Sequence, residues 1–332
     1  MSPHQPLNPS ALRPSRRIDD CSRLDDSYLA YARSIAHEAS DPRRRLDVCR
    51  RLIHSGLIGE TISMLATLVN VPQLRPEVSE MMAQVRELRQ LRAGNGVALP
   101  DGGAEGASDD RGYWVVPAQS DTTLIAFTGR AQRLGLSIYF MHSLLSRLNA
   151  NVIYLFDWAN SFYFAGVSGL SRDTETTVAQ LRALCAGLHS RRVLCIGQSA
   201  GGYGALRYGA KLNADGIIAF SPLILPVMAS RTRARIEAET GLPLTEEETD
   251  LRRLLANHSR PPHIEIVYGT DNAADVASAR HLAGLPTVVE RPLQGVSSHG
   301  TIQETVIGKT FGPLLHAFST AAGPGLVGPL PR

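Results

Sequence analysis

The chain has 332 residues, of which 43% are hydrophobic, and it carries a formal net charge of +3. This length and apolar fraction suit one large soluble domain or two of ordinary size, and the small charge argues against a nucleic-acid partner. No apolar run is long enough for a membrane span or a signal peptide, so we expect no membrane association. The four cysteines lack metal-ligand spacing and suggest reduced thiols in a cytoplasmic setting.

The first hundred residues are expected to be mainly helical. Residues 1–24, rich in Pro, Ser and Arg, read as a disordered leader. From 25 to 92 apolar residues recur at helical spacing in four stripes, which predict two helical hairpins. The hairpin 46–72, with its small-residue joint and trailing proline, loosely resembles a tetratricopeptide unit. That resemblance implies a surface for a protein partner, and a helical cap packed on the main domain is the alternative.

A linker at 93–111, made mostly of Gly, Ala, Asp and Ser, separates this segment from residues 112–318, where apolar strands alternate with helices. Such alternation predicts an α/β fold with a mostly parallel sheet and helices on both faces. A charged helical insertion at 222–262 lies where a lid could sit, and the tail 319–332 is expected to be disordered. The expected strands are 113–117, 122–127, 151–156, 193–196, 216–220, 263–268 and 287–291; the expected helices include 136–148, 176–188, 274–283 and 302–318.

One stretch of this alternation carries a chemical motif. The apolar strand 193–196 runs into Gly-Gln-Ser-Ala-Gly at 197–201 and then into a helical sequence. A G-x-S-x-G pentapeptide between a buried strand and a helix is typical of a nucleophile elbow, in which a strained serine is presented at a tight turn. Glycines at Gly197 and Gly201 supply the room that the turn needs. We therefore expect Ser199 to be a nucleophile.

With this motif in place, residues 113–318 resemble an α/β-hydrolase domain, in which the catalytic residues follow in the order Ser, acid, His. The resemblance implies that the histidine lies in a loop after the last strand of the sheet. Here the strand ending near Arg291 is followed by LQGVSSHG, which places His299 in that loop. His299 is therefore the expected general base for Ser199.

The resemblance also implies an acid in a loop after an earlier strand, and the turn after the strand 263–268 offers two aspartates. Asp271 lies at the end of the strand and resembles the acid position of the family, so we favour it. Asp275 is placed to cap the helix that follows and is the alternative.

Other parts of the site are expected at the carboxyl ends of the strands. The oxyanion hole would combine the amide of Ala200 with that of Gly129 or Arg130, in the loop after strand 122–127. The loop after strand 151–156 is rich in aromatic residues, which could line an apolar or sugar-stacking pocket or pack the loop onto the body. The expected substrate-binding residues are Trp158, Phe162 and Tyr163.

The sequence thus indicates a serine hydrolase, with an esterase-like activity favoured, that cleaves a small-molecule ester, thioester or amide through an acyl-enzyme on Ser199. No nucleotide-binding motif or metal cluster is found, and no cofactor is expected. Two alternatives stay open. One is an acyltransferase of the same fold. The other is a non-catalytic, hydrolase-like adaptor that binds a protein partner through its helical N-terminal segment.

Overall fold

A seven-stranded sheet organises the part of the chain that the computed structural model describes, namely residues 41–54, 58–94, 112–136, 138–224, 230–245 and 249–323. The strand order is β1-β3-β2-β4-β5-β6-β7. β1 runs antiparallel to β3, and all other neighbours are parallel. The strands are β1 (Tyr113–Val116), β2 (Thr122–Phe127), β3 (Asn151–Leu155), β4 (Arg192–Gln198), β5 (Gly216–Phe220), β6 (His263–Gly269) and β7 (Val288–Leu293).

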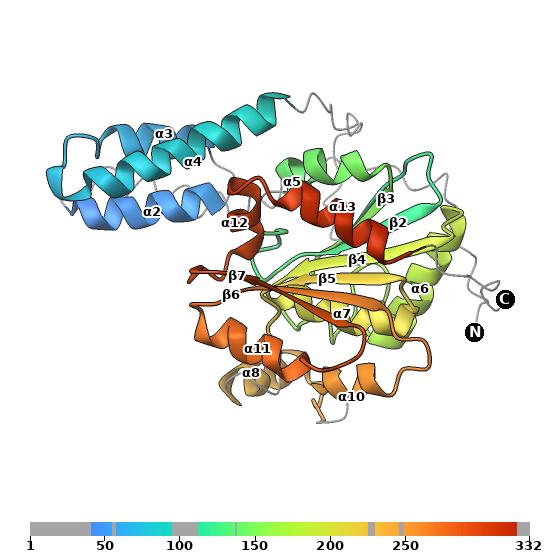
Figure 1. The fold of residues 1–332 in the computed structure, drawn as a ribbon. Coiled ribbons are helices and arrows are strands. Elements are labelled where there is room, and N and C mark those ends of the chain that lie inside the picture. Colours follow the sequence, from blue (N-terminus) through green and yellow to red (C-terminus); the bar gives the residue numbers. More distant parts are fainter. Residues whose placement is uncertain are drawn as a thin grey trace.

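Helices cover both faces of this sheet (Figure 1). One face carries α5 (Ile138–Leu145), α12 (Thr301–Ile307) and α13 (Phe311–Ala321). The other carries α6 (Thr174–Gly187), α7 (Ala200–Leu212) and α11 (Ala273–Leu282). The α/β fold with a mostly parallel, doubly covered sheet, expected from the sequence, is confirmed.

Alternation along the strands explains the two layers. Successive side chains of a strand point to opposite faces, and the central strands are apolar at nearly every position. In β2, Leu124 and Ala126 belong to the core under α5 and α13, whereas Ile125 and Phe127 belong to the core over α7. Burial on both faces therefore fixes the carboxyl ends of β2 and β4 side by side, and the G-x-S-x-G motif begins at the end of β4.

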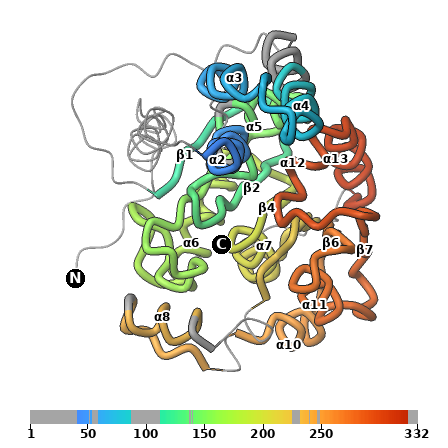
Figure 2. Tube along the Cα trace, turned by 90° about the vertical axis from the view of Figure 1, so that its left-hand side faces the viewer, coloured from blue at the N-terminus to red at the C-terminus, as the bar shows by residue number. Residues whose placement is uncertain are grey.

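The N-terminal segment forms an arm of α2 (Pro42–His54), α3 (Ile58–Ala66), the short 3₁₀ helix Pro72–Leu74 and α4 (Arg75–Gly94). Figure 2 places α3 and α4 on the same side of the sheet as α5 and α12. The apolar side chains of the arm belong to one continuous core with those of α5, α12 and α13. This is the packing that a helical cap requires.

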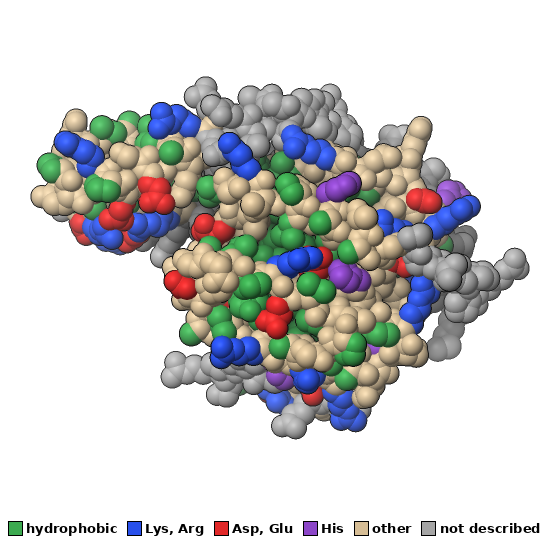
Figure 3. Space-filling view, viewed as in Figure 1, with side chains coloured by type: hydrophobic (Ala, Val, Ile, Leu, Met, Phe, Trp, Pro, Cys, Tyr) green, Lys and Arg blue, Asp and Glu red, His purple; other side chains and the backbone are tan. Residues whose placement is uncertain are grey.

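Charges of both signs are interleaved on the arm, as Figure 3 shows on its lower side. Glu77 pairs with both Arg43 and Arg50, and Arg50 also contacts Asp47. These guanidinium groups are therefore neutralised by neighbouring carboxylates.

Some boundaries differ from the sequence-based expectations. The single helix expected at 302–318 is two helices, because α12 ends at Ile307 with Gly308 as its C-cap, Lys309 takes a positive φ of 58°, and Pro313 lies in the first turn of α13. α4 extends to Gly94, beyond the expected end of the helical segment at 92, and α13 extends to Ala321, beyond the expected end at 318. The expected leader, the first helical stripe, most of the linker and the end of the tail lie outside the described residues.

The insertion after β5 contributes α8 (Ser230–Thr240) and α10 (Leu251–Ala256). α10 packs against α7 and α11, and the Tyr203 hydroxyl donates a hydrogen bond to the Thr249 carbonyl at 3.1 Å. Arg235 of α8 donates to the Asn160 carbonyl at 3.1 Å. Among the described residues, no helix combines the length and apolar character needed to cross a bilayer.

Candidate active site

The strand-to-helix turn between β4 and α7 holds Ser199 in a strained conformation, with φ 59° and ψ −123°. A side chain on either flanking glycine would prevent this turn. A Cβ on Gly197 would lie 2.1 Å from the Gly201 carbonyl oxygen, and one on Gly201 would lie 2.2 Å from the Phe127 carbonyl oxygen. The glycines thus allow the close backbone approach that presents Ser199 at the strand end.

Three side chains from three separate segments of the chain form a hydrogen-bonded series at this point. The Ser199 Oγ lies 2.9 Å from Nε2 of His299, which belongs to the loop between β7 and α12. The His299 Nδ1 lies 2.6 Å from Oδ1 of Asp275 in the first turn of α11. The Asp275 side chain is buried, whereas that of His299 is 39% exposed, so solvent can reach the imidazole.

The carboxylate that contacts His299 is that of Asp275 and not that of the favoured Asp271. Asp271 is exposed, its Oδ1 accepts from the Thr270 hydroxyl at 2.9 Å, and its amide donates to the Val296 carbonyl at 3.0 Å. The loop after β7 therefore packs across the end of β6 at Asp271. This path of the loop places His299 beside the first turn of α11, which contains Asp275.

Three residues that the sequence analysis did not identify support Asp275, and among them the Ser221 hydroxyl contacts its carboxylate. Oδ2 accepts from the buried Ser221 hydroxyl at 2.7 Å, and that hydroxyl also lies 3.0 Å from Thr301 Oγ1. The Asn272 side chain caps α11 by accepting from the Asp275 amide at 3.2 Å. Its Nδ2 donates to the Ser297 carbonyl, which ties α11 to the histidine loop. Only Asn272 had a sequence signal, as an N-cap residue before a helix.

The expected oxyanion donors lie beside Ser199, but one of them is engaged. Ala200 begins α7, where a helix leaves its first amides without an intrahelical acceptor. A Cβ on Gly129 would lie 3.8 Å from Ser199 Cβ, so this loop flanks Ser199. The Gly129 amide, however, donates to the Arg133 carbonyl at 2.8 Å. For the exposed Arg130 amide, no acceptor is found among the described residues, which leaves it as the candidate of this loop.

The aromatic loop after β3 differs from the expectation at two of three residues. Phe162 and Tyr163 are fully buried, and the Tyr163 hydroxyl lies 2.9 Å from the carbonyls of both Thr128 and Leu155. The Asp157 carboxylate accepts from the Tyr163 amide and so supports the positive-φ backbone at Phe162 and Tyr163, in which both rings are buried. Burial raises the pKa of Asp157, and the hydrogen bonds from Tyr163 and Ser161 oppose that shift. These two rings therefore pack the loop onto the body.

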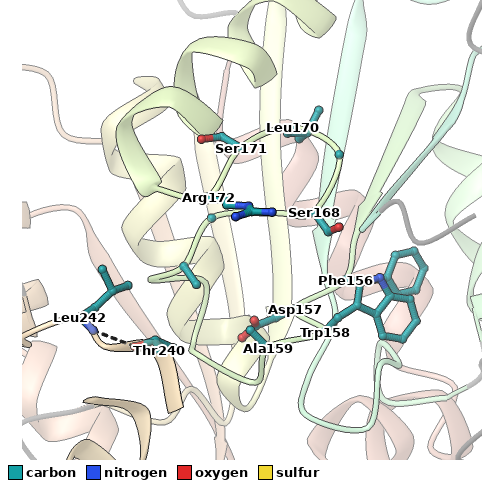
Figure 4. Close-up of a pocket in the computed structure, with 13 residues that line it drawn as sticks. Phe156, Asp157, Trp158, Ala159, Ser168, Leu170, Ser171, Arg172, Thr240 and Leu242 are labelled. Carbon is teal, nitrogen blue, oxygen red and sulfur yellow. Dashed lines mark hydrogen bonds between the residues drawn. The ribbon is translucent and has the colours of Figure 1, made fainter. Parts of the chain in front are cut away.

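Trp158 is the aromatic residue of this loop that faces solvent, with 44% of its surface exposed. Its indole stacks on Phe156 at 5.4 Å and lines a cavity of about 640 Å³, which Arg172 also lines (Figure 4). Thr240 and Leu242 form the wall contributed by the insertion. Ser199, His299 and Asp275 do not line this cavity. In the part of the chain that the structure describes, no cluster of three or more His, Cys, Asp or Glu side chains could hold a metal ion.

No protein-family model and no curated protein matches the sequence. Solved structures do match. An α/β hydrolase from the metagenome of lagoon sediments at Mar Chica, Morocco, is 13% identical, with a TM-score of 0.45, over 66% of this chain and 97% of that one. An esterase of Pyrococcus furiosus is 14% identical, with a TM-score of 0.41, over 63% and 87%. The glycosylation-associated protein complex of Streptococcus agalactiae is 17% identical, with a TM-score of 0.46, over 62% and 44%.

Proposed function

We propose that this chain is a serine hydrolase that cleaves an ester, thioester or amide through an acyl-enzyme on Ser199. The observation that carries the proposal is the series Ser199–His299–Asp275, with separations of 2.9 and 2.6 Å, at a strained strand-to-helix turn. These are a nucleophile, a base and a group that orients the base, each within hydrogen-bond reach of the next.

The chemistry follows from the positions of the atoms. His299 Nε2 takes the proton of Ser199 as Oγ attacks the substrate carbonyl, and the amides of Ala200 and Arg130 stabilise the oxyanion that forms. His299 then returns the proton to the leaving alcohol, thiol or amine. Asp275 stays ionised, holds the Nδ1 proton and stabilises the imidazolium. A water molecule, activated by His299 in the same way, releases the acyl group.

Labelling with a fluorophosphonate probe, together with hydrolysis of p-nitrophenyl esters of increasing acyl length, tests this proposal. Ser199→Ala should abolish labelling and lower kcat by a factor on the order of 10⁶. Equal labelling of the variant and the wild type would contradict a nucleophilic Ser199. Wild-type protein that neither reacts with the probe nor turns over would favour the adaptor alternative.

Hydrolysis is preferred to acyl transfer because the His299 side chain is 39% exposed, which gives water access to the base. An acyltransferase needs a pocket that excludes water from the acyl-enzyme. Product analysis with added alcohols and amines separates the two, since an acyltransferase would yield mainly the transferred acyl product.

A further inference from the structure

Two buried glutamines connect the loops that meet at Ser199. Gln198 is the last residue of β4 and directly precedes the nucleophile, and Gln303 lies in the first turn of α12, four residues after His299. Their exposed fractions are 7% and 5%. Neither residue takes part in the Ser199–His299–Asp275 series, so the chemistry proposed above does not account for them.

Their side-chain amides form one continuous chain of hydrogen bonds. Gln198 Nε2 donates to the backbone carbonyl of His299 at 3.1 Å and to Gln303 Oε1 at 3.3 Å. Gln303 Nε2 donates to the Gly135 carbonyl at 2.6 Å. Gly135 ends the segment that begins with the oxyanion candidates after β2. This series of hydrogen bonds therefore joins three segments: the turn from β4 to α7, the loop between β7 and α12 that contains His299 (the histidine loop), and the loop after β2 that contains Gly129 and Gly135 (the oxyanion loop).

The direction of these amides is fixed by chemistry. Both ends of the chain are backbone carbonyls, which only accept, so each NH₂ group must point outward to a carbonyl. This orientation leaves Gln198 Oε1 buried without a partner among the described residues. An unpaired buried oxygen lowers the stability of the folded state. The fold thus tolerates an unpaired Gln198 Oε1, while the Gln198 Nε2 group donates to both the His299 carbonyl and Gln303 Oε1.

The oxyanion loop is in direct contact with this pair. Gly135 has a φ of 74°, and a Cβ there would lie 2.6 Å from Gln198 Oε1 and 2.7 Å from Ile302 Cβ. Only glycine permits this approach. A shift of α12 would therefore move His299 and the oxyanion loop together.

We propose that Gln198 and Gln303 are positioning residues that keep the general base and the oxyanion site in one fixed geometry; this inference rests on the proposed function. Misplacement of catalytic groups by about 1 Å can cost on the order of 100-fold in rate. Loss of the amide chain should therefore lower kcat and leave KM almost unchanged, since neither side chain needs to touch the substrate.

The test compares Gln198→Leu, Gln303→Leu and the double variant with a matched control, Asn151→Leu. Asn151 is also a fully buried amide, with hydrogen bonds to Ala118 and Ser120, but it lies at the amino end of β3, whereas Ser199 follows the carboxyl end of β4. We expect each single variant to lose about 10- to 100-fold in kcat, with KM within about twofold. The double variant should lose no more than the larger single loss, because one chain is broken in every case. Asn151→Leu should lower the melting temperature with kcat unchanged.

A second readout does not depend on turnover. The proton between His299 Nδ1 and Asp275 should give a downfield NMR signal that shifts or broadens in Gln303→Leu and stays in place in Asn151→Leu. Additive losses in the double variant, an unchanged kcat, or an unmoved signal would each overturn the proposal. Failure of wild-type labelling at Ser199 would instead overturn the proposed function. The NMR comparison would still decide whether the glutamines position His299.

Discussion

At the level of single residues, the choice between Asp275 and Asp271 determines what His299 can do. Asp275 is buried, lies 2.6 Å from Nδ1 and receives a second hydrogen bond from Ser221. A carboxylate held in this way fixes the tautomer that leaves Nε2 free to accept the serine proton. Asp271 is exposed and contacts Thr270 instead.

Asp275→Asn should therefore lower kcat by about 10³- to 10⁴-fold, because an amide at this position favours the wrong tautomer of His299. Steady-state hydrolysis of a p-nitrophenyl ester measures the loss. Asp271→Asn is the matched control, four residues earlier in the turn between β6 and α11, and should keep kcat within about twofold of the wild type. A larger loss in Asp271→Asn than in Asp275→Asn would refute this assignment of the acid.

At the level of elements, the turn from β4 to α7 depends on backbone packing that no larger residue allows. Gly201→Ala should destabilise the fold by more than about 3 kcal/mol, because the added Cβ would lie 2.2 and 2.6 Å from the carbonyl oxygens of Phe127 and Thr128, which are backbone atoms of a buried strand end. Urea unfolding followed by circular dichroism measures the change.

The control for that substitution is Gly312→Ala, in the first turn of α13, where a Cβ meets nothing within 4 Å. It should be neutral or stabilise the protein by up to about 1 kcal/mol, through the higher helix propensity of alanine. Equal stability losses in the two variants would mean that close packing does not explain the glycine in the elbow.

The same elements show where sequence reasoning succeeds and where it fails. The elbow was predictable because its glycine spacing, its strand and its helix are contiguous in sequence. The acid was not, since it depends on how the loop after β7 lies across β6. That loop is fixed by the contact of Gly269 with Val296 and the hydrogen bond from Asn272 to Ser297, about 25 residues apart. The break between α12 and α13 had local signals, Gly308 and Pro313, which the apolar periodicity outweighed.

The inward turn of the aromatic loop needed tertiary information as well. Composition alone left open whether the three rings line a pocket or pack the loop onto the body. Burial of Phe162 and Tyr163 follows from positive φ values of 57° and 65°, which the Asp157 carboxylate supports through the Tyr163 amide. Such strained conformations persist only where the surrounding tertiary structure determines them. A short stretch of sequence does not reveal that surrounding structure.

At the level of the whole molecule, the helical arm and the body built on the sheet meet where α4 packs on α12, the helix that directly follows His299. Glu304 of α12 lies in this contact. Burial raises its pKa above the ordinary value of 4.5, a hydrogen bond from Ser298 opposes the shift, and the negative charge of Glu80 on α4 adds to it. A raised folded-state pKa means that Glu304 favours the fold below its ordinary pKa, and that this contribution is lost as the pH rises through the folded value.

Replacing Glu80 by lysine should therefore stabilise the protein at about pH 8, because an attraction to ionised Glu304 replaces a repulsion between the arm and the body. The gain should be a few tenths of a kcal/mol, as is usual for partly exposed pairs, and it should vanish near pH 4, where Glu304 is protonated. Melting temperatures measured across this pH range, with Glu80→Gln as the neutral control giving an intermediate gain, decide the matter. A gain that is equal at both ends of the range would place Glu80 away from Glu304 in solution, and the arm would then not be held against the histidine-bearing end of the sheet.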